Sequence, residues 1–444
     1  MAREITRRAW QRPRLSHPGW ARIPQIVIGV ALATIVAGIT IHAVNGGLGA
    51  GTPPFISRWL PSLDPLAAVS VVVVVTVVAL APRAVSRIRA PLVFAAFAFG
   101  LSLALGLAVN LARDGVHGWY IVFDTSAHGS FEAANEYLPS LPALAADGPR
   151  FFLDHFAELV PSLAVNASGH PPGLLLTMDA LGLNTAQRLA AFCIGVGALA
   201  APLAYVLGRG LLDERGGRVA ALLTAFAPSV ILDATVSPDA VYMTLGVACA
   251  ALLVSRRRSL WLTGAVAVAI AGFFSWLLLG IPLWAAVIVG LRDGRRRAAW
   301  LLVSCAIAVL LFNGALALAV GYDAIGTLRA TSAVYHRSLA LSRPYLYWLF
   351  GSPTAWGVML GIPTAVLALR GLAARHPTAI ALAVIIVVSA VLGVTKAETE
   401  RIWLPYVPLA AVAAAAMAPR RLYPLLGALA LQALIVEVLF DTIW

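Results

Sequence analysis

The chain has 444 residues, of which 60% are hydrophobic and only 12% are charged, and its mean hydropathy is +0.87. Soluble globular domains are about half apolar and about a quarter charged, so a single water-soluble domain, a disordered chain, a collagen and a disulfide scaffold are all excluded. The net charge of +12 comes from 32 basic and 20 acidic residues. In a membrane protein, the positions of these charges along the chain matter more than their sum.

Long apolar runs dominate the chain, and a membrane-crossing helix needs about 20 such residues. They predict an all-α polytopic membrane protein with about thirteen transmembrane helices. The short runs at 259–274 and 276–291 could also form one bent hairpin. In chain order the runs fall at 23–44, 65–82, 91–112, 186–208, 217–235, 238–255, 259–274, 276–291, 298–320, 345–369, 377–394, 403–418 and 422–440.

Arginine clusters fall in every second connection, beginning with the basic tail at 1–22. Positive charge is retained on the cytoplasmic side of a membrane. We therefore expect these connections and the N-terminus to be cytoplasmic and the C-terminus to be extracytoplasmic, in the plasma membrane. The inner connections hold 23 of the 32 basic residues and four acidic ones, whereas the outer connections hold nine basic and fifteen acidic residues. Residues 23–444 are predicted to form one transmembrane domain that includes a large outer loop at 113–185.

Patterns typical of soluble cofactor sites are missing from the sequence. There is neither a G-x-G-x-x-G fingerprint nor a phosphate-binding P-loop. The three cysteines form no CxxC pair, so they predict neither a zinc site nor a disulfide framework. Dispersed Asp and His residues show no ligand spacing for zinc or calcium. No metal, cofactor or nucleic-acid partner is predicted.

The outer loop at 113–185 is rich in aromatic residues, histidines and carboxylates, and loops of this length are usually functional or disordered. Residues 149–163 have helical apolar spacing, which predicts an amphipathic helix lying in the outer membrane interface. Asp124 and Glu136 are the candidate bases, because a carboxylate beside the membrane can take a proton from an acceptor hydroxyl. A solvated loop face is an equally good interpretation of either residue.

His170 lies in the sequence Gly-His-Pro-Pro-Gly at the end of this loop, where the prolines stiffen the entry to an apolar helix. Asp239 follows Ser237 and Pro238 at the predicted start of the 238–255 span, where a helix-capping role is the alternative to substrate binding. His336 and Arg337 belong to a basic, aromatic outer loop that suits a phosphate or a sugar, or serves as a plain juxtamembrane anchor.

The connection at 395–405 carries four charges in six residues between two apolar runs, which is costly beside a membrane. It includes Lys396, the only lysine in the chain. One interpretation is a cationic cradle for a phosphate head group, formed by Lys396 and Arg401, with Glu398 orienting it. The other is a compact turn of ions paired with one another.

These motifs, in this order and all on the predicted outer side, resemble the GT-C superfamily of membrane glycosyltransferases. The segment GHPPGLLL is similar to an element of protein O-mannosyltransferases, and KAETERIWLPYVPLA is similar to the late charged loop of aminoarabinose-transferase-like members. The Asp-Glu pair of those families falls on Asn135-Glu136 here, which leaves the base open between Glu136 and Asp124.

The resemblance implies transfer of a sugar from a polyprenyl-phosphate donor to an acceptor glycan, lipid or protein at the outer membrane face, with inversion at the anomeric carbon. Lys396, Arg401 and either His336 or Arg337 would stabilise the leaving lipid phosphate, and His170 would shape the donor site. The main alternative is a transporter or flippase of a lipid-linked saccharide. A transporter is expected to place polar groups and helix breaks in paired positions at mid-bilayer. A third possibility is a non-catalytic assembly protein.

Overall fold

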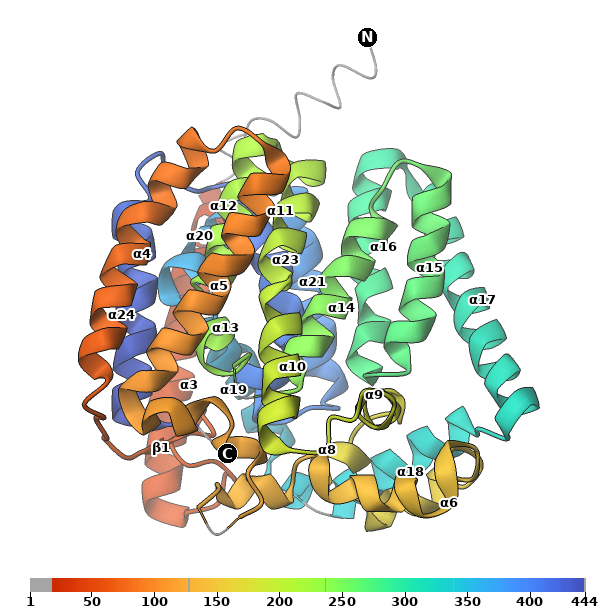
Figure 1. Cartoon of the computed structure of the whole chain (residues 1–444). Helices are drawn as coiled ribbons and strands as arrows, with labels where there is room; N and C mark the ends of the chain where they lie inside the picture. The colour runs from red at the N-terminus through yellow and green to blue at the C-terminus, as the bar shows by residue number, and fades with distance from the viewer. Residues whose placement is uncertain (1–17, 127, 236, 338, 443–444) are drawn as a thin grey trace.

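The computed structural model describes residues 18–126, 128–235, 237–337 and 339–442. Nearly all of its regular structure is helical (Figure 1). Within the described ranges, the one sheet pairs two short antiparallel strands, β1 (Arg58–Trp59) and β2 (Phe440–Asp441), which join the connection at 46–66 to the end of the last helix. The all-α prediction is confirmed.

Six helical segments in the described part of the chain are long and apolar enough to cross a membrane, so the protein is membrane-embedded. A seventh exists if the bent pair α19 (Tyr345–Met359) and α20 (Ile362–Ala373) counts as one span. The six comprise α3 (Ile23–Asn45), α4 (Ala67–Arg87), α5 (Pro91–Asp114) with the 3-10 turns η1 (Gly115–Trp119) and η2 (Ile121–Phe123), α10 (Ala186–Ala198) with α11 (Ala200–Leu211), η6 (Trp276–Gly280) with α16 (Ile281–Asp293), and α17 (Arg295–Val320).

Five further apolar helices are shorter, between 10 and 17 residues. The predicted total of thirteen spans therefore stays a prediction. The five are α14 (Asp239–Leu253), α15 (Arg258–Gly272), α21 (Pro377–Leu392), η8 (Leu404–Tyr406) with α23 (Val407–Ala415), and α24 (Tyr423–Leu439).

The other elements are short segments, most of them at the end of the molecule that carries the outer loop. They are α2 (Pro18–Ala21), η3 (Phe131–Ala134), η4 (Leu138–Ser140), α6 (Leu141–Asp154), α7 (Phe156–Leu159), η5 (Val160–Ser162), α8 (Val165–Ser168), α9 (Gly173–Leu181), α12 (Glu214–Ala225), α13 (Pro228–Leu232), α18 (Ala324–Arg337), η7 (Leu339–Ser342) and α22 (Thr399–Ile402).

Two predicted spans are broken in the structure. The run at 217–235 is divided between α12 and α13, because Pro228 begins a new helix and its ring cannot continue the old one. The run at 345–369 bends by 115° between α19 and α20, where Gly361 has a φ of 96°. Apolar composition predicted membrane-length runs at both places but did not reveal the breaks.

The single amphipathic helix predicted at 149–163 is divided into the end of α6, α7 and η5. The residues at the predicted apolar positions nevertheless form the face that packs, because Phe152, Phe156 and Val160 are fully buried. The break between α6 and α7 falls at His155, whose φ and ψ are −104° and 11°. Pro161 lies in the first turn of η5, where it cannot donate to continue the hydrogen-bond ladder of α7.

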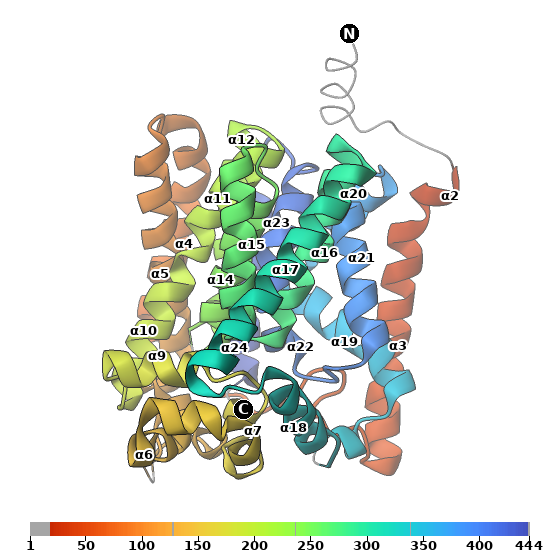
Figure 2. The ribbon, with the colours of Figure 1, turned by 90° about the vertical axis from the view of Figure 1, so that its right-hand side faces the viewer.

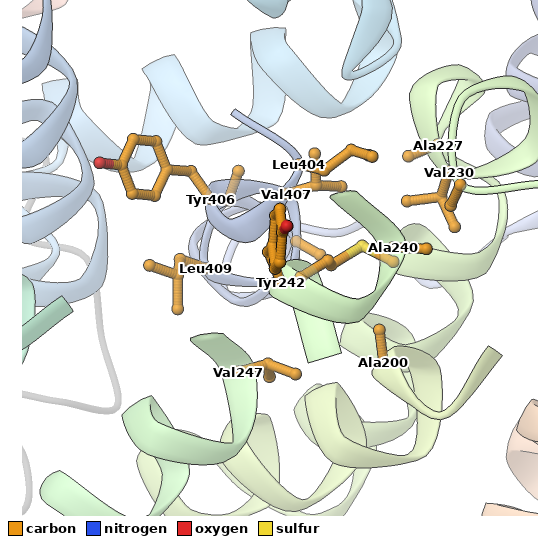
Figure 3. Close-up of a cluster of buried hydrophobic side chains, with 14 of the residues drawn as sticks. Ala200, Ala227, Val230, Ala240, Tyr242, Val247, Leu404, Tyr406, Val407 and Leu409 are labelled. Atoms are coloured by element: carbon orange, nitrogen blue, oxygen red, sulfur yellow. The ribbon is translucent and has the colours of Figure 1, made fainter. Parts of the chain in front are cut away.

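The core is formed where α12 and α23 pack between the surrounding helices. All nine residues of α23 are buried. Helices α11 and α12 approach so closely that a Cβ atom on Gly217 would lie 2.7 Å from the backbone oxygen of Tyr205. Figure 3 shows Tyr242 and Val247 of α14 facing Leu404, Val407 and Leu409 across this core.

The basic connections gather at one end of the molecule, and the outer loop lies at the opposite end (Figures 1 and 2). Arg215 donates to the carbonyl oxygen of Pro419 at 2.7 Å, which joins the first turn of α12 to the α23–α24 connection. Arg218 donates to the carbonyl oxygen of Val85, and Arg297 donates to that of Ser255. The predicted alternation of arginine-rich connections with the other connections therefore corresponds to two distinct ends of the molecule.

Candidate functional site

Arg401 lies among carboxylates from three separate parts of the chain, and we call Arg401, Glu136, Asp239 and Glu398 the Arg401 cluster. Its Nη1 is 3.4 Å from Oε1 of Glu136, its Nε is 3.5 Å from Oδ2 of Asp239, and its Nη2 is 3.2 Å from Oε2 of Glu398. All four residues were candidates from the sequence. Glu136 comes from the outer loop, Asp239 begins α14, and Glu398 precedes α22.

The Arg401 cluster is buried, with a fully inaccessible Glu136 and with Arg401 and Asp239 only 8% and 5% exposed. Burial raises the pKa of the Glu136 carboxyl to about 7, because the charged form loses its water; Arg401 and the amide of Asn166 oppose this shift. Burial disfavours the charge of Arg401 as well, but the three carboxylates outweigh it and raise the pKa of the guanidinium. Glu136 can therefore gain or lose a proton near neutral pH.

Asn166, which the sequence analysis missed, positions Glu136. Its side-chain amide donates to Oε1 of Glu136 at 2.7 Å, and its backbone N–H donates to the carbonyl oxygen of Asn135 at 2.9 Å. Its own carbonyl oxygen lies 2.9 Å from Nδ1 of His170. Asn166 thus connects the Gly-His-Pro-Pro-Gly segment to the candidate base. An Asn four residues before His170 was the available signal, but nothing in its spacing indicated a partner 30 residues away.

His170 packs beside two buried tyrosines. The hydroxyls of Tyr137 and Tyr242 are 2.7 Å apart, and the His170 ring centroid is 5.0 Å from that of Tyr242. Burial lowers the pKa of His170, so the ring is neutral and its tautomer follows from the bond to Asn166. Gly173 fixes the end of this segment, since a Cβ there would lie 2.4 Å from the carbonyl oxygen of Phe273.

The segment before α22 is held in an uncommon backbone conformation. Ala397 and Glu398 both have positive φ angles, of 63° and 56°, which is costly for residues other than glycine. Arg343 supports the segment, because its Nη2 is 2.6 Å from Oε1 of Glu398 and its Nη1 donates to the carbonyl oxygen of Lys396. Burial opposes the charge of Glu398, but Arg343 and Arg401 outweigh it and lower the pKa of this carboxyl.

Lys396 lies beside the Arg401 cluster and bonds to two residues near it. Its Nζ donates to the carbonyl oxygen of Arg343 at 3.0 Å, and its backbone N–H donates to the hydroxyl of Tyr335 at 3.0 Å. The predicted turn of self-paired ions and the predicted phosphate cradle are thus both compatible with this segment: Arg401 pairs with Glu398, while Lys396 stays partly exposed.

Glu400 and Asp233 extend the buried acidic region. Oε1 of Glu400 accepts a hydrogen bond from the N–H of Ile56 at 2.8 Å. Burial raises the pKa of Glu400 to about 7. Three buried carboxylate oxygens in the described structure have no hydrogen-bond partner: Oε2 of Glu136, Oε2 of Glu400 and Oδ2 of Asp233. Unpartnered buried carboxylates are costly, which favours protonated forms or a polar ligand at this place.

Asp124 is not part of the Arg401 cluster. Its Oδ2 is 3.1 Å from Nε2 of His117, and its Oδ1 accepts from the N–H of Ser126 at 2.9 Å. The bonds from Ser126, followed by that of His117, lower the pKa of Asp124. It lines a cavity of about 1000 Å³ to which Glu136 does not contribute. The structure thus separates the two candidate bases.

His336 and Arg337 are exposed at the end of α18, and neither makes a hydrogen bond or ion pair with the Arg401 cluster in the described part of the chain. Nδ1 of His336 is 2.7 Å from the carbonyl oxygen of Ser332. Tyr335 is the residue of this helix that reaches the site, through Lys396. Over the described ranges, no group of three or more His, Cys, Asp or Glu side chains is arranged to hold a metal ion.

Comparison of the chain with protein-family models, with curated proteins and with solved structures finds no match.

Proposed function

We propose that this protein is a polyprenyl-phosphate-sugar-dependent glycosyltransferase of the GT-C type. The observation that carries the proposal is the Arg401 cluster: one buried arginine joins a carboxylate that titrates near neutral pH to the charged segment at 393–403. General acid–base catalysis needs a group whose pKa lies near the working pH, and a leaving phosphate needs a nearby cation.

In the proposed reaction, Glu136 takes the proton of an acceptor hydroxyl while that oxygen attacks the anomeric carbon of the donor. The bond between that carbon and the phosphate oxygen breaks, and its electron pair leaves with the polyprenyl phosphate. One displacement inverts the anomeric centre. Lys396 and Arg401 stabilise the leaving phosphate, and the neutral His170 shapes the donor site. Glu136 suits the base better than Asp124, whose pKa is lowered rather than raised.

Glu136 has no exposed surface, so a substrate reaches it only when a covering segment moves. The segment at 393–403 is the candidate for this motion, because its two positive-φ residues make it costly to hold. Arg401 belongs to the same segment. Entry of a phosphate there would exchange a carboxylate partner of Arg401 for the ligand.

The proposed arrangement in the cell follows the charge distribution. We infer about thirteen spans, with the N-terminus in the cytoplasm and the C-terminus outside the plasma membrane. In this arrangement the Arg401 cluster lies at the outer face. The clustering of the arginine-rich connections at the other end supports this orientation.

To test this, the purified protein is reconstituted in liposomes with a radiolabelled donor, which is polyprenyl-phosphate mannose, glucose or arabinose. A cell-envelope extract supplies the acceptor. We expect labelled product from at least one donor with wild-type protein and a loss of at least about 100-fold with Glu136→Gln. The exposed-residue variant Glu158→Gln serves as the control. Equal transfer by Glu136→Gln and wild type would remove the proposed base.

A lipid-saccharide transporter is the second candidate, and one observation favours it. Ionisable groups lie buried beside broken helices: Asp233 and Asp239 flank the break between α13 and α14, and the α19–α20 pair bends by 115°. Transporters form substrate and ion sites at such interruptions. The same liposomes distinguish the two functions. A transporter moves the lipid-linked sugar between leaflets with its phosphate bond intact, whereas the proposed enzyme cleaves that bond.

A further inference from the structure

A cavity of about 1000 Å³ opens beside the outer loop, away from the buried Arg401 cluster. This volume is at the upper end of the range, about 300–1000 Å³, found for small-molecule sites. One wall is built by the outer loop from η2 to α6, and the other by the connection from α9 to α10. Its polar lining includes Asp124, Ser126, Asp179, Asn184, Thr185 and Gln187.

The lining chemistry selects among ligand classes. Among the described residues that line the cavity there are two carboxylates but no lysine, arginine or histidine. The two carboxylates would repel an anionic group placed there. The guanidinium of Arg188 lies beside the lining, but it is exposed to water and already donates to Gly182 and Asn184. Carboxylate, amide and hydroxyl groups together offer both donors and acceptors, which suits a ligand with many hydroxyl groups. The accessible apolar lining, with Leu138, Leu141 and Pro142, can pack against the apolar face of a sugar ring.

Two polar side chains of the cavity are already oriented. His117 and the N–H of Ser126 hold the Asp124 carboxylate from both oxygens. The side-chain oxygen of Asn184 accepts from Nη1 of Arg188 at 3.2 Å, so its amide NH₂ remains available to donate. Groups fixed before binding lose less conformational entropy when a ligand arrives.

We propose that this cavity binds the acceptor of the reaction and that the acceptor is an uncharged or amine-bearing carbohydrate. The ligand's role as the acceptor rests on the proposed function. The binding of a carbohydrate in this cavity does not. The segment at 131–140 lines the cavity through Ala133, Ala134 and Leu138 while its Glu136 side chain points into the buried cluster. The cavity and the candidate base thus share one segment of chain. The donor phosphate, by the same electrostatic argument, binds elsewhere.

The test measures protection of a cysteine in the cavity wall. Ala145 lines the cavity and is exposed, and its exposed neighbour Ala146 does not line it. The native Cys193, Cys249 and Cys305 are buried, so they should react slowly with maleimide. The full-length variants Ala145→Cys and Ala146→Cys are prepared in lipid nanodiscs free of sugar-headed detergent. Their maleimide labelling rates are measured with mannobiose, glucosamine or mannose 6-phosphate.

We expect mannobiose or glucosamine to slow labelling of Ala145→Cys at least fivefold, with no effect on Ala146→Cys and none from mannose 6-phosphate. Adding Asp179→Ala or Gln187→Ala should weaken the protection at least fivefold. Absence of protection by both uncharged and amine-bearing probes, or equal protection by mannose 6-phosphate, would overturn the proposal. Protection without any sugar transfer in the liposome assay would retain the carbohydrate site and reject the proposed enzyme.

Discussion

Glu136 and Asp124 come from the same outer loop yet lie in opposite environments. Glu136 is fully buried against Arg401 and its pKa is raised to about 7, whereas Asp124 lines an open cavity and its pKa is lowered. The difference arises from their partners: loss of water dominates at Glu136, and hydrogen bonds from Ser126 and His117 dominate at Asp124. One loop thus supplies a carboxyl of raised pKa to the interior and a carboxylate held by hydrogen bonds to the cavity.

The variants Glu136→Gln and Asp124→Asn distinguish these two roles, and Glu136→Gln has the largest expected effect. Glu136→Gln should lower the turnover rate of sugar transfer about 100- to 10,000-fold, the range for loss of a general base. Asp124→Asn should change mainly KM, by about tenfold or less, because it weakens hydrogen bonds to the acceptor. Steady-state kinetics of both variants measure the two constants. A larger loss of turnover in Asp124→Asn than in Glu136→Gln would reverse the assignment.

Arg401→Met tests whether the stability of the buried Arg401 cluster depends on its cation. The variant leaves Glu136, Asp239 and Glu398 without their shared partner. Breaking a buried ion pair in this way costs about 3–5 kcal/mol of unfolding free energy. Urea unfolding in detergent measures it. Arg337→Met, which removes an exposed arginine, is the matched control. Equal stability of the two variants would contradict the dependence of the three carboxylates on Arg401.

The pH dependence of stability sharpens the same contrast. The Glu136 carboxyl has an ordinary pKa of 4.5 and a folded pKa of about 7, so the folded state retains protons that the unfolded state releases. Stability should therefore fall as pH rises from 4.5 to about 7 and then level off, with Glu400 adding to the slope. Unfolding at several pH values checks this. Glu136→Gln should reduce the slope, and an unchanged slope would contradict the raised pKa.

Asn166→Ala is expected to have a much smaller effect than Glu136→Gln, and it tests positioning. The amide of Asn166 stabilises the charged form of Glu136, so its loss should raise the pKa of Glu136 and move the pH–rate profile to higher pH. We expect about a tenfold loss of activity at neutral pH, the size of one charged hydrogen bond, with partial recovery at higher pH. Asn313→Ala, in α17, is the control. A uniform loss at every pH would indicate only structural damage.

Much of the fold could be predicted because apolar runs and arginine clusters are local features of the sequence that indicate helices and the connections between them. The helical breaks at Ala227–Pro228 and Leu360–Gly361 were not predicted, although a proline and a glycine mark them, because Pro82 and Pro353 lie inside α4 and α19 without ending those helices. The site was predicted in part. Glu136, Asp239, Glu398 and Arg401 meet, while Asp124, His336 and Arg337 lie apart from them. Asn166 and Asp233 were missed because their partners are distant in the chain.

The most direct test of the contrast between the two carboxylates is an infrared titration of the protein in lipid nanodiscs between pH 4 and 9. The account predicts a protonated-carboxyl band that titrates near pH 7, shrinks in Glu136→Gln and persists unchanged in Asp124→Asn. Glu400 contributes to the same band, so the difference between the two variants carries the result. A band near pH 7 that survives in full in Glu136→Gln, or one that disappears in Asp124→Asn, would contradict the account.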